Sequence, residues 1–529
     1  MKKLYPLFIL ACAILMAANI QAQRYVLIEA SDDPANPANI FSTIMGDTTA
    51  AGARIDNNTI YQLENGRVYV STGRIVNKPE WALQIEAVNL EDTDNKAILT
   101  RIPNASGDYQ DIMYSEGNVT FKNLWIIAGE TGPLQQHDWG RVRVLGENSR
   151  IIIKDCIIEK DRGGFLQLRA DGVKCYVENS IFRNGGNRRI LQGNGRGIDA
   201  RNFYMDTLIM RNTIVHNIQD RLFRSQGATQ PHHYIEIDHC TSFNTVGRHG
   251  HIQLGRVLTA KITNNLFINP IMMGTSPFYT DEQTQPDGDQ HKVITIDTLY
   301  ENTALSIAGN NIFWTQDVIN YWATNDSVSM PPVLSGLVAQ HLGAAASDAF
   351  FQEPLELNNV PGTILQYVID LYNNPASENM YDFIVEDELV AGTPYDSGNL
   401  FDFSEFDPCY GSETVSATAG TDGGSIGAVS ACLALGVFDT EANPNLAFTV
   451  QPNPVGTEAS LRFSLSRSGR ISLTVYDLTG RRVEQLYNGA LLSGEHSILW
   501  TPDGRLAKGM YFAHLQTEEG TMALKLMLK

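Results

Sequence analysis

Long apolar runs are absent beyond the first 22 residues, which argues against a membrane-spanning helix of about 18 to 20 apolar residues in the body of the chain. The N-terminus instead carries Lys2 and Lys3, an apolar run from Leu4 to Ala18, and the small residue Ala22 at the expected cleavage site. This is the pattern of a secretory signal peptide. We therefore expect residues 1–22 to be a signal peptide, the mature chain to begin at Gln23, and the exported body to have no transmembrane segment.

Positive charge is scarce, because 39 Lys and Arg residues face 59 Asp and Glu residues and the formal net charge is -20. An excess of negative charge disfavours nonspecific nucleic-acid binding, so we expect no nucleic-acid partner. The chain is 43% hydrophobic, which is ordinary for a soluble globular protein and sufficient for a sizeable core. A local basic patch remains compatible with the acidic total, so the distribution of charge matters more than its sum.

Cysteine is also sparse, and five cysteines remain after removal of the signal peptide. None has the spacing of a metal-ligand motif. Cys156 and Cys240 sit among apolar residues and are expected in the core. Cys409 and Cys432 flank one loop-like segment and are candidates for a disulfide in an oxidising compartment.

One short sequence motif, here called the phrase, recurs seven times between residues 119 and 313. It consists of an alternating apolar strand, a polar pivot residue and another apolar pair, as in Ile151-Ile-Ile153-Lys-Asp155-Cys-Ile157. A strand that pairs with its own successor one coil later needs its apolar residues in phase, so this repeat predicts a parallel β-helix. The pivots are Asn123, Asp155, Asn179, Asn212, His239, Asn264 and, less well registered, Asn310.

Asparagine tolerates turn backbone and hydrogen-bonds to neighbouring chain, so a stacked pivot column is expected to be structural, His239 included. A short amphipathic helix over residues 39–45 is expected to cover one end. On these features the chain resembles the pectate-lyase-like family of right-handed β-helices. We expect the body to span residues 23–437, with regular coils over about 60–320 and an irregular C-terminal cover after them.

From Asn443 onward, short strands alternate with turn residues, which predicts an all-β, immunoglobulin-like sandwich over residues 438–529. This segment resembles the type A C-terminal sorting domain of the type IX secretion system. The resemblance implies passage through the periplasm of a Bacteroidota-type bacterium, a type IX machinery partner, and secretion or attachment to surface lipopolysaccharide. It rests on Pro452, Asn453, Pro454, Asp477, Gly480, Gly509, Tyr511 and Lys525.

A second strand lies upstream of each pivot and is the expected location of a binding face. If Val142, Leu168, Ala200, Leu222 and Ile252 point inward, alternation turns the neighbouring polar residues outward as one column of arginines. Residues 183–256 hold ten arginines and no lysine against five carboxylates, a local net of 10 − 5 = +5. The expected substrate-binding residues are Arg141, Arg143, Arg169, Asp199, Arg221 and Arg224.

Stacked like charges are unfavourable unless they are paired or bridged by an anion, which leaves two interpretations open. The first is a groove for an acidic, uronate-containing polysaccharide, since arginine binds carboxylates in bidentate fashion. The second is a set of solvated Arg–Asp pairs.

Six of the eleven histidines fall between His216 and His251. His249 and His251 are two positions apart and are expected to share a strand face, where they would act with Arg201 as catalytic groups. Beta-elimination of a uronate needs a base and a positive charge that stabilises the enolate. The sequence therefore favours an exported polysaccharide lyase, with calcium as a candidate cofactor and a monomer expected.

Two alternatives to a lyase remain open. One is a noncatalytic glycan-binding or adhesive surface protein. The other is a glycoside hydrolase, because the phrase from His249 to Gly255 is similar to the histidine motif of polygalacturonase-like enzymes. Hydrolysis requires a pair of carboxylates, and the paired-aspartate phrases of those enzymes are absent. The full calcium-binding carboxylate set of pectate lyases is absent as well.

Overall fold

The computed structural model describes most of the chain after residue 22, and the chain forms two compact units, residues 1–429 and 430–529. The described residues are 23–128, 142–186, 195–275, 292–369, 408–429 and 448–529, with gaps at 34–35, 109, 162, 248, 326–327, 359, 361–363, 366–367, 454, 466–467, 478–481, 503–505, 507 and 518–519. The predicted signal peptide lies outside these residues. No helix among them is long and apolar enough to cross a membrane.

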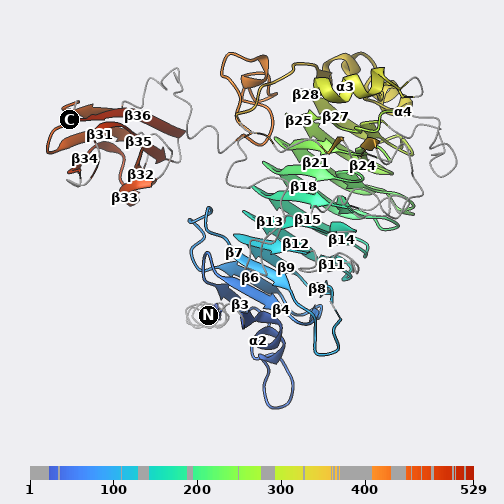
Figure 1. Cartoon of the computed structure of the whole chain (residues 1–529), viewed down its shortest axis with the longest axis horizontal. Coiled ribbons are helices and arrows are strands. Elements are labelled where there is room, and N and C mark those ends of the chain that lie inside the picture. The colour runs from blue at the N-terminus through green and yellow to red at the C-terminus, as the bar shows by residue number, and fades with distance from the viewer. Residues whose placement is uncertain are drawn as a thin grey trace, which may run out of the picture. The chain divides into compact units, whose positions relative to one another are not determined.

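Three parallel sheets form the first unit, and each strand pairs with the strand one coil later (Figure 1). The first sheet contains β1 (Tyr25–Ile28), β3 (Ile60–Leu63), β6 (Leu83–Ala87), β9 (Val119–Lys122), β12 (Arg150–Lys154), β15 (Val173–Glu178), β18 (Met205–Arg211), β21 (His232–Asp238), β24 (Val257–Thr263) and β27 (Ala304–Ala308). The second contains β2 (Ala38–Asn39), β4 (Val68–Ser71), β7 (Ala97–Arg101), β10 (Leu124–Ile127), β13 (Ile157–Glu159), β16 (Ile181–Gly185), β19 (Ile214–Ile218), β22 (Thr241–Thr245), β25 (Leu266–Ile268), β28 (Asn310–Phe313) and β29 (Phe350–Phe351). The third contains β5 (Ile75–Asn77), β8 (Met113–Ser115), β11 (Val142–Val144), β14 (Gly164–Leu168), β17 (Arg196–Asp199), β20 (Phe223–Arg224), β23 (Ile252–Gln253) and β26 (Ile294–Thr295).

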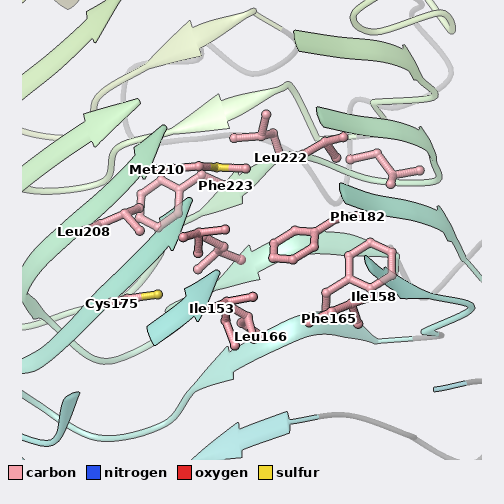
Figure 2. Close-up of a cluster of buried hydrophobic side chains, with 14 of the residues drawn as sticks. Ile153, Ile158, Phe165, Leu166, Cys175, Phe182, Leu208, Met210, Leu222 and Phe223 are labelled. Carbon is pink, nitrogen blue, oxygen red and sulfur yellow. The ribbon is translucent and has the colours of Figure 1, made fainter. Parts of the chain in front are cut away.

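The predicted right-handed parallel β-helix is confirmed, and its core is built as the repeat requires. Ile151 pairs with Cys175, and Cys175 pairs with Leu208, so apolar side chains stack in register from coil to coil. Phe165 and Phe182 pack with ring centroids 5.3 Å apart inside the helix (Figure 2). Cys156, Cys175 and Cys240 are free, buried thiols, which confirms the core positions of Cys156 and Cys240.

The backbone at the pivots explains why the repeat favours asparagine. Six of the seven predicted pivots have positive φ, between 45° and 58°, a conformation that asparagine tolerates better than most residues. The seventh prediction is wrong by one residue, because Thr263 pairs with Ala308 and this register places Gly309 opposite Asn264. Gly309 adopts a φ of 63°, and Asn310 is buried instead.

A second asparagine column lies elsewhere in the coil, and the repeat analysis missed it. Asn184, Asn217, Asn244 and Asn269 all have positive φ and are buried. Side-chain amides donate from Asn217 to Asn184 at 3.4 Å, from Asn244 to Asn217 at 3.1 Å and from Asn269 to Asn244 at 3.0 Å. This column joins successive coils by amide-to-amide hydrogen bonds within the buried interior.

The N-terminal capping helix is confirmed as α2 (Ile40–Gly46), which packs beside β4 at the first coils (Figure 1). Asn39 caps it, its side chain accepting from the Phe41 amide at 3.1 Å, and Ile40 and Ile44 face the core. Beyond the regular coils come α3 (Gln316–Ala323), α4 (Gly336–Leu342) and the 3-10 segments Gly343–Asp348 and Val415–Ala417.

Residues 408–429, here called the strap, cover the second sheet. Ile426 of the strap packs in one cluster with Phe243, Ile268 and Phe313. Cys409 is disulfide-bonded, whereas Cys432, the partner that the sequence favours, lies outside the described residues.

The strap is fixed to the pivot column by backbone and ionic contacts. The amide of Thr421 donates to Asn264 Oδ1 at 2.7 Å. The ring of His239 lies between two carboxylates, with Nδ1 3.1 Å from Asp238 and Nε2 3.3 Å from Asp422 of the strap. The hydrogen bond to Asp238 and the charges of both carboxylates raise the pKa of His239, against the effects of burial and of Lys261.

This geometry predicts that the strap loosens as pH rises. A raised folded-state pKa means that the stabilisation is fully present below the unfolded value of about 6.5 and is lost as pH rises through the folded pKa. We expect the hydrogen-exchange protection of the Thr421 amide, corrected for intrinsic rate, to fall several-fold above that pH. In His239→Gln the protection should not change with pH. Equal pH dependence in both proteins would contradict this role for His239.

The second unit is a small β-sandwich, as predicted. One antiparallel sheet contains β30 (Phe448–Gln451), β31 (Ala459–Leu465) and β34 (Gly494–Trp500), and the other contains β33 (Arg482–Leu491), β32 (Gly469–Asp477), β35 (Gly509–Thr517) and β36 (Gly520–Leu528). Leu461, Leu473, Trp500 and Leu515 form its shared core.

The predicted sorting-motif residues fall at strand ends and within strands of this sandwich. Pro452 and Asn453 follow β30, and Asp477 ends β32. Gly509 and Tyr511 lie in β35, and Lys525 lies in β36. Pro454 and Gly480 lie outside the described residues.

Candidate functional site

The outward column of the third sheet is mixed, not a column of arginines as predicted. Arg143 pairs with Gln167, Gln167 with Asp199, Asp199 with Arg224 and Arg224 with Gln253. The inward residues Val142, Leu168, Ala200, Leu222 and Ile252 are buried as expected. Arg141 lies outside the described residues.

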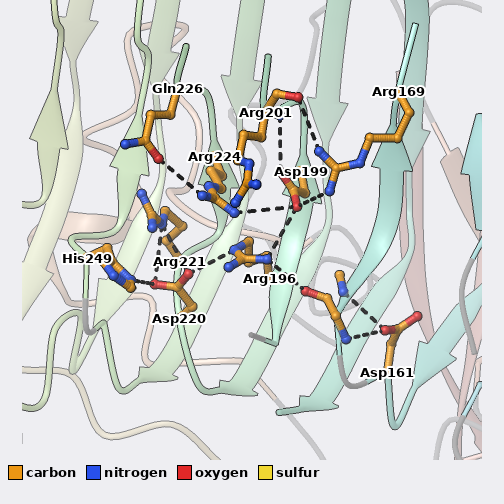
Figure 3. A network of polar contacts seen from close by, with 12 residues as sticks. Asp161, Arg169, Arg196, Asp199, Arg201, Asp220, Arg221, Arg224, Gln226 and His249 are labelled. Carbon is orange, nitrogen blue, oxygen red and sulfur yellow. Dashed lines mark hydrogen bonds and ion pairs between the residues drawn. The ribbon is translucent and has the colours of Figure 1, made fainter. Parts of the chain in front are cut away.

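The third-sheet arginines gather around two buried carboxylates, Asp199 and Asp220 (Figure 3). Asp199 Oδ2 lies 3.0 Å from Arg169 Nη2, 3.3 Å from Arg196 Nη1 and 3.8 Å from Arg224 Nη1. Asp220 Oδ2 lies 2.9 Å from Arg196 Nε and 3.3 Å from Arg221 Nε, and its Oδ1 lies 3.0 Å from His249 Nδ1. We call this set the arginine cluster: Arg169, Arg196, Asp199, Asp220, Arg221, Arg224 and His249.

Positive charge exceeds negative charge within the arginine cluster, which holds four guanidiniums and two carboxylates. Burial alone would raise the pKa of both carboxyls. The neighbouring arginines outweigh burial at Asp199 and lower its pKa. Arg221, the hydrogen-bonded His249 and Arg196 outweigh it at Asp220, whose pKa lies well below its usual range. Burial, with the neighbouring charges of Arg196 and Arg221, lowers the pKa of Arg224 to about 8. The charge on Arg224 is therefore poorly compensated among the described residues.

Further hydrogen bonds fix the guanidiniums in place. Arg224 Nη2 donates to Gln226 at 3.1 Å, and Arg221 Nη1 donates to Gln253. The nearby carboxylate of Asp161 accepts from the backbone amides of Gly163 and Gly164, at 2.6 and 3.1 Å. Asp161 therefore stabilises its own loop.

The three predicted catalytic residues occupy different environments. Arg201 is exposed at the rim, where its backbone amide donates to Asp199 and its carbonyl accepts from Arg169 (Figure 3). His249 belongs to the arginine cluster and is 17% exposed. The predicted outward orientation of His251 is wrong, because its ring is fully buried and packs edge-on against Phe267 with centroids 5.3 Å apart.

Burial also lowers the pKa of His251 to about 3, so this imidazole is neutral near pH 7 and has no acid/base role at the surface. His251 precedes β23 in a bend, where the strict alternation of a strand does not hold. His249 and His251 therefore do not act together.

Arg196 and Asp220 are central to the arginine cluster, and sequence reasoning did not assign them to the site. Arg196 bridges both carboxylates, but alternation puts it on the same face as the inward Ile198. Asp220 lies just before Arg221 and outside any strand. The excess of arginine over residues 183–256 was the available signal, and it marked the region but not these two positions.

His232 and Ser225 form a buried pair that superficially looks catalytic. His232 Nδ1 accepts the Met205 amide at 2.9 Å, so the proton of the neutral ring is on Nε2, which lies 2.5 Å from Ser225 Oγ. The imidazole therefore donates to the hydroxyl and does not act as a base toward it. This pair ties neighbouring coils together.

A calcium site does not fit the described residues. No three His, Cys, Asp or Glu side chains among them gather so as to hold a metal ion. Asp199, a predicted substrate-binding residue, and Asp220 are surrounded by guanidiniums, which repel a divalent cation.

Comparison with known proteins assigns the second unit. Residues 449–529 match the secretion system C-terminal sorting domain. No curated protein and no solved structure matches the chain. The parallel sheets are therefore the only support for a likeness between the body and pectate-lyase-like proteins. This likeness concerns the fold and assigns no activity to the chain. With its C-terminal sandwich as the sorting signal, the chain is a β-helix protein exported by the type IX secretion system to the cell surface or beyond.

Proposed function

We propose that the exported body binds an acidic polysaccharide, whose carboxylates are held at the arginine cluster. The observation that carries this proposal is the charge of the cluster, where Asp199 and Asp220 face four guanidiniums. Holding uncompensated charges close together away from water costs free energy, and an incoming anion relieves that cost.

The chemistry of the cluster favours a carboxylated glycan. A guanidinium presents planar, paired donors that match a carboxylate, and arginine is the only cation type in this region besides histidine. The ligand would approach over Arg201, which is exposed, and Arg169, whose side chain is 24% exposed. The rest of the chain carries a net negative charge, so the excess of positive charge is confined to this region.

Lyase activity is a second candidate, favoured by the pairing of His249 with Asp220. In β-elimination His249 would take the C5 proton of a uronate, which leaves the electron pair on the adjacent carboxyl group as an enolate. Collapse of the enolate would form the C4–C5 double bond and break the C4–O bond, and the departing oxygen would take a proton from water. Asp220 would stabilise the imidazolium, and Arg169 and Arg224 the enolate oxygen. Hydrolysis is disfavoured, because the lowered pKa values of Asp199 and Asp220 keep both ionised and neither can act as a general acid.

Export completes the proposal. After removal of the sorting domain the body would be attached to surface lipopolysaccharide or released, where polysaccharides are available.

The test is binding of the mature chain to a panel of polyuronates and neutral glycans. We expect polyuronates alone to bind, with affinity falling as salt rises. Arg224→Gln and the exposed Arg201→Ala should weaken binding about tenfold or more, since a hydrogen bond to a charged group is worth about 1.5 to 3 kcal/mol. Arg201→Ala should leave the melting temperature unchanged.

Arg256→Gln is the matched control, because Arg256 is exposed between β23 and β24 and lies outside the arginine cluster. Equal binding of neutral glycans, or equal loss in the control, would overturn the proposal. Absorbance from unsaturated products, lost in His249→Gln, would establish the lyase. Binding without such absorbance would leave a noncatalytic glycan-binding protein.

A further inference from the structure

A tyrosine and two arginines occupy the outer face of the third sheet, on the N-terminal side of the arginine cluster. Tyr114 lies in β8, Arg143 lies in β11 of the next coil, and Arg74 immediately precedes β5 of the preceding coil. The guanidinium carbon of Arg74 is 3.9 Å from the centre of the Tyr114 ring, and that of Arg143 is 4.7 Å from it. Two cations from different coils thus share one aromatic ring.

The two guanidiniums are held with little use of their hydrogen-bond donors. A ring attracts a cation through its quadrupole, which neither neutralises the charge nor occupies N–H groups. Arg74 lies 3.8 Å from Asp111 and donates to Gln110 at 3.4 Å, a long contact. Within the described part of the chain, Arg143 has no carboxylate at ion-pair distance, and the Nε atoms of both arginines are buried without a hydrogen-bond partner.

The register of the third sheet places Arg74, Tyr114 and Arg143 in line with the arginine cluster. Arg143 pairs with Gln167, Gln167 with Asp199 and Asp199 with Arg224. Three strand-to-strand steps therefore separate Arg143 from Arg224, about 14 Å at about 4.8 Å per step. One carboxylate does not reach both positions, because its two oxygens match a single guanidinium fork.

We propose that Arg74 and Arg143, held against Tyr114, form a second anion-binding position, and that the ligand is a polyuronate chain long enough to occupy it and the arginine cluster together. This inference rests on the proposed function and adds to it the length of the ligand. Two positions on one rigid sheet face act as linked sites, so a chain that spans both gains affinity over one that reaches the cluster alone.

The experiment measures the affinity of the mature chain for size-graded oligouronates by calorimetry. For the wild type we expect a rise of about tenfold or more at the length that spans both positions, since a charged hydrogen bond is worth about 1.5 to 3 kcal/mol. Arg143→Gln should abolish this rise and leave the affinity for the shortest oligomers unchanged. Arg224→Gln should weaken every length.

Tyr114 provides a matched pair of variants. Tyr114→Phe keeps the ring and should keep the rise with length, whereas Tyr114→Leu removes the ring and should lose it. A rise that persists in Arg143→Gln, or wild-type binding that does not depend on length, overturns the second position while the arginine cluster stands. Failure of oligouronates of every length to bind the wild type overturns the proposed function itself.

Discussion

Acidification from pH 6.5 toward pH 3 is expected to unfold the β-helix, because three histidines are buried in it as neutral imidazoles. Burial lowers the pKa of His216, His232 and His251 each to about 3, with a further contribution from Arg183 at His216 and from His233 at His232. In the unfolded chain these groups titrate near 6.5. Between these values the unfolded state binds more protons, so stability is full above pH 6.5 and is lost as pH falls.

The magnitude is large relative to the stability of a typical protein. Each histidine removes about 1.4 kcal/mol per pH unit within this window, so the three together remove about 4 kcal/mol per unit. Typical unfolding free energies are about 5 to 15 kcal/mol. At His232 a local contact also opposes protonation of the ring, because a proton added at Nδ1 would face the Met205 amide that now donates to this nitrogen.

Urea unfolding of residues 23–529, followed by circular dichroism from pH 8 to pH 4, measures this effect. His251→Leu keeps an apolar side chain against Phe267 and should reduce the slope of unfolding free energy against pH by about one third. His341→Gln, at an exposed position in α4, controls for the loss of one imidazole. A slope that is unchanged in His251→Leu would mean that His251 does not remain neutral in the fold.

The sequence predicted the architecture well because the β-helix repeats its constraint in every coil. The pivot φ values and the buried apolar pairs recur wherever the phrase recurs, and Gly309 replaced asparagine at the one pivot that was misplaced. The amphipathic helix predicted over residues 39–45 and the sorting sandwich also follow from local patterns. In each case neighbouring residues determine the outcome.

The sequence predicted the region of the candidate site but not the positions and pairings of its side chains. Strands of the third sheet are as short as two residues, as in β20 and β23, and loops of different lengths separate them. Alternation cannot set the register across such loops, so Arg224 and not Arg221 came to pair with Asp199. The inward turn of His251 and the bridging position of Arg196 likewise depend on packing between coils.

Replacing Asp220 with alanine is expected to destabilise the body more than removing any single cluster arginine. Asp220 is fully buried, compensates the charges of Arg196 and Arg221, and contacts His249 through its other oxygen. Breaking a buried ion pair by removing one partner costs about 3 to 5 kcal/mol, and here the loss leaves Arg221 without its paired carboxylate and, among the described residues, Arg196 with Asp199 alone. The unfolding free energy in urea at pH 7.5 should fall by this amount.

Two comparisons isolate the cause of that loss. Asp206→Ala removes a partly exposed carboxylate paired with Lys174 and His233, and should cost about 1 kcal/mol or less. The double variant Asp220→Leu with Arg221→Met should be more stable than Asp220→Ala, since replacing both charges with apolar groups removes the uncompensated cation. A double variant that is no more stable would mean that shape, and not charge, makes Asp220 important.

The same variant connects stability with binding. If uncompensated positive charge is what draws a polyuronate to the arginine cluster, Asp220→Ala increases that charge while loosening the scaffold that holds it. Saturating polyuronate should therefore raise the melting temperature of Asp220→Ala more than that of the wild type, because ligand that binds only the folded state stabilises it. A smaller shift in the variant would show that Asp220 serves the ligand by positioning Arg196 and Arg221, and that their geometry outweighs their charge.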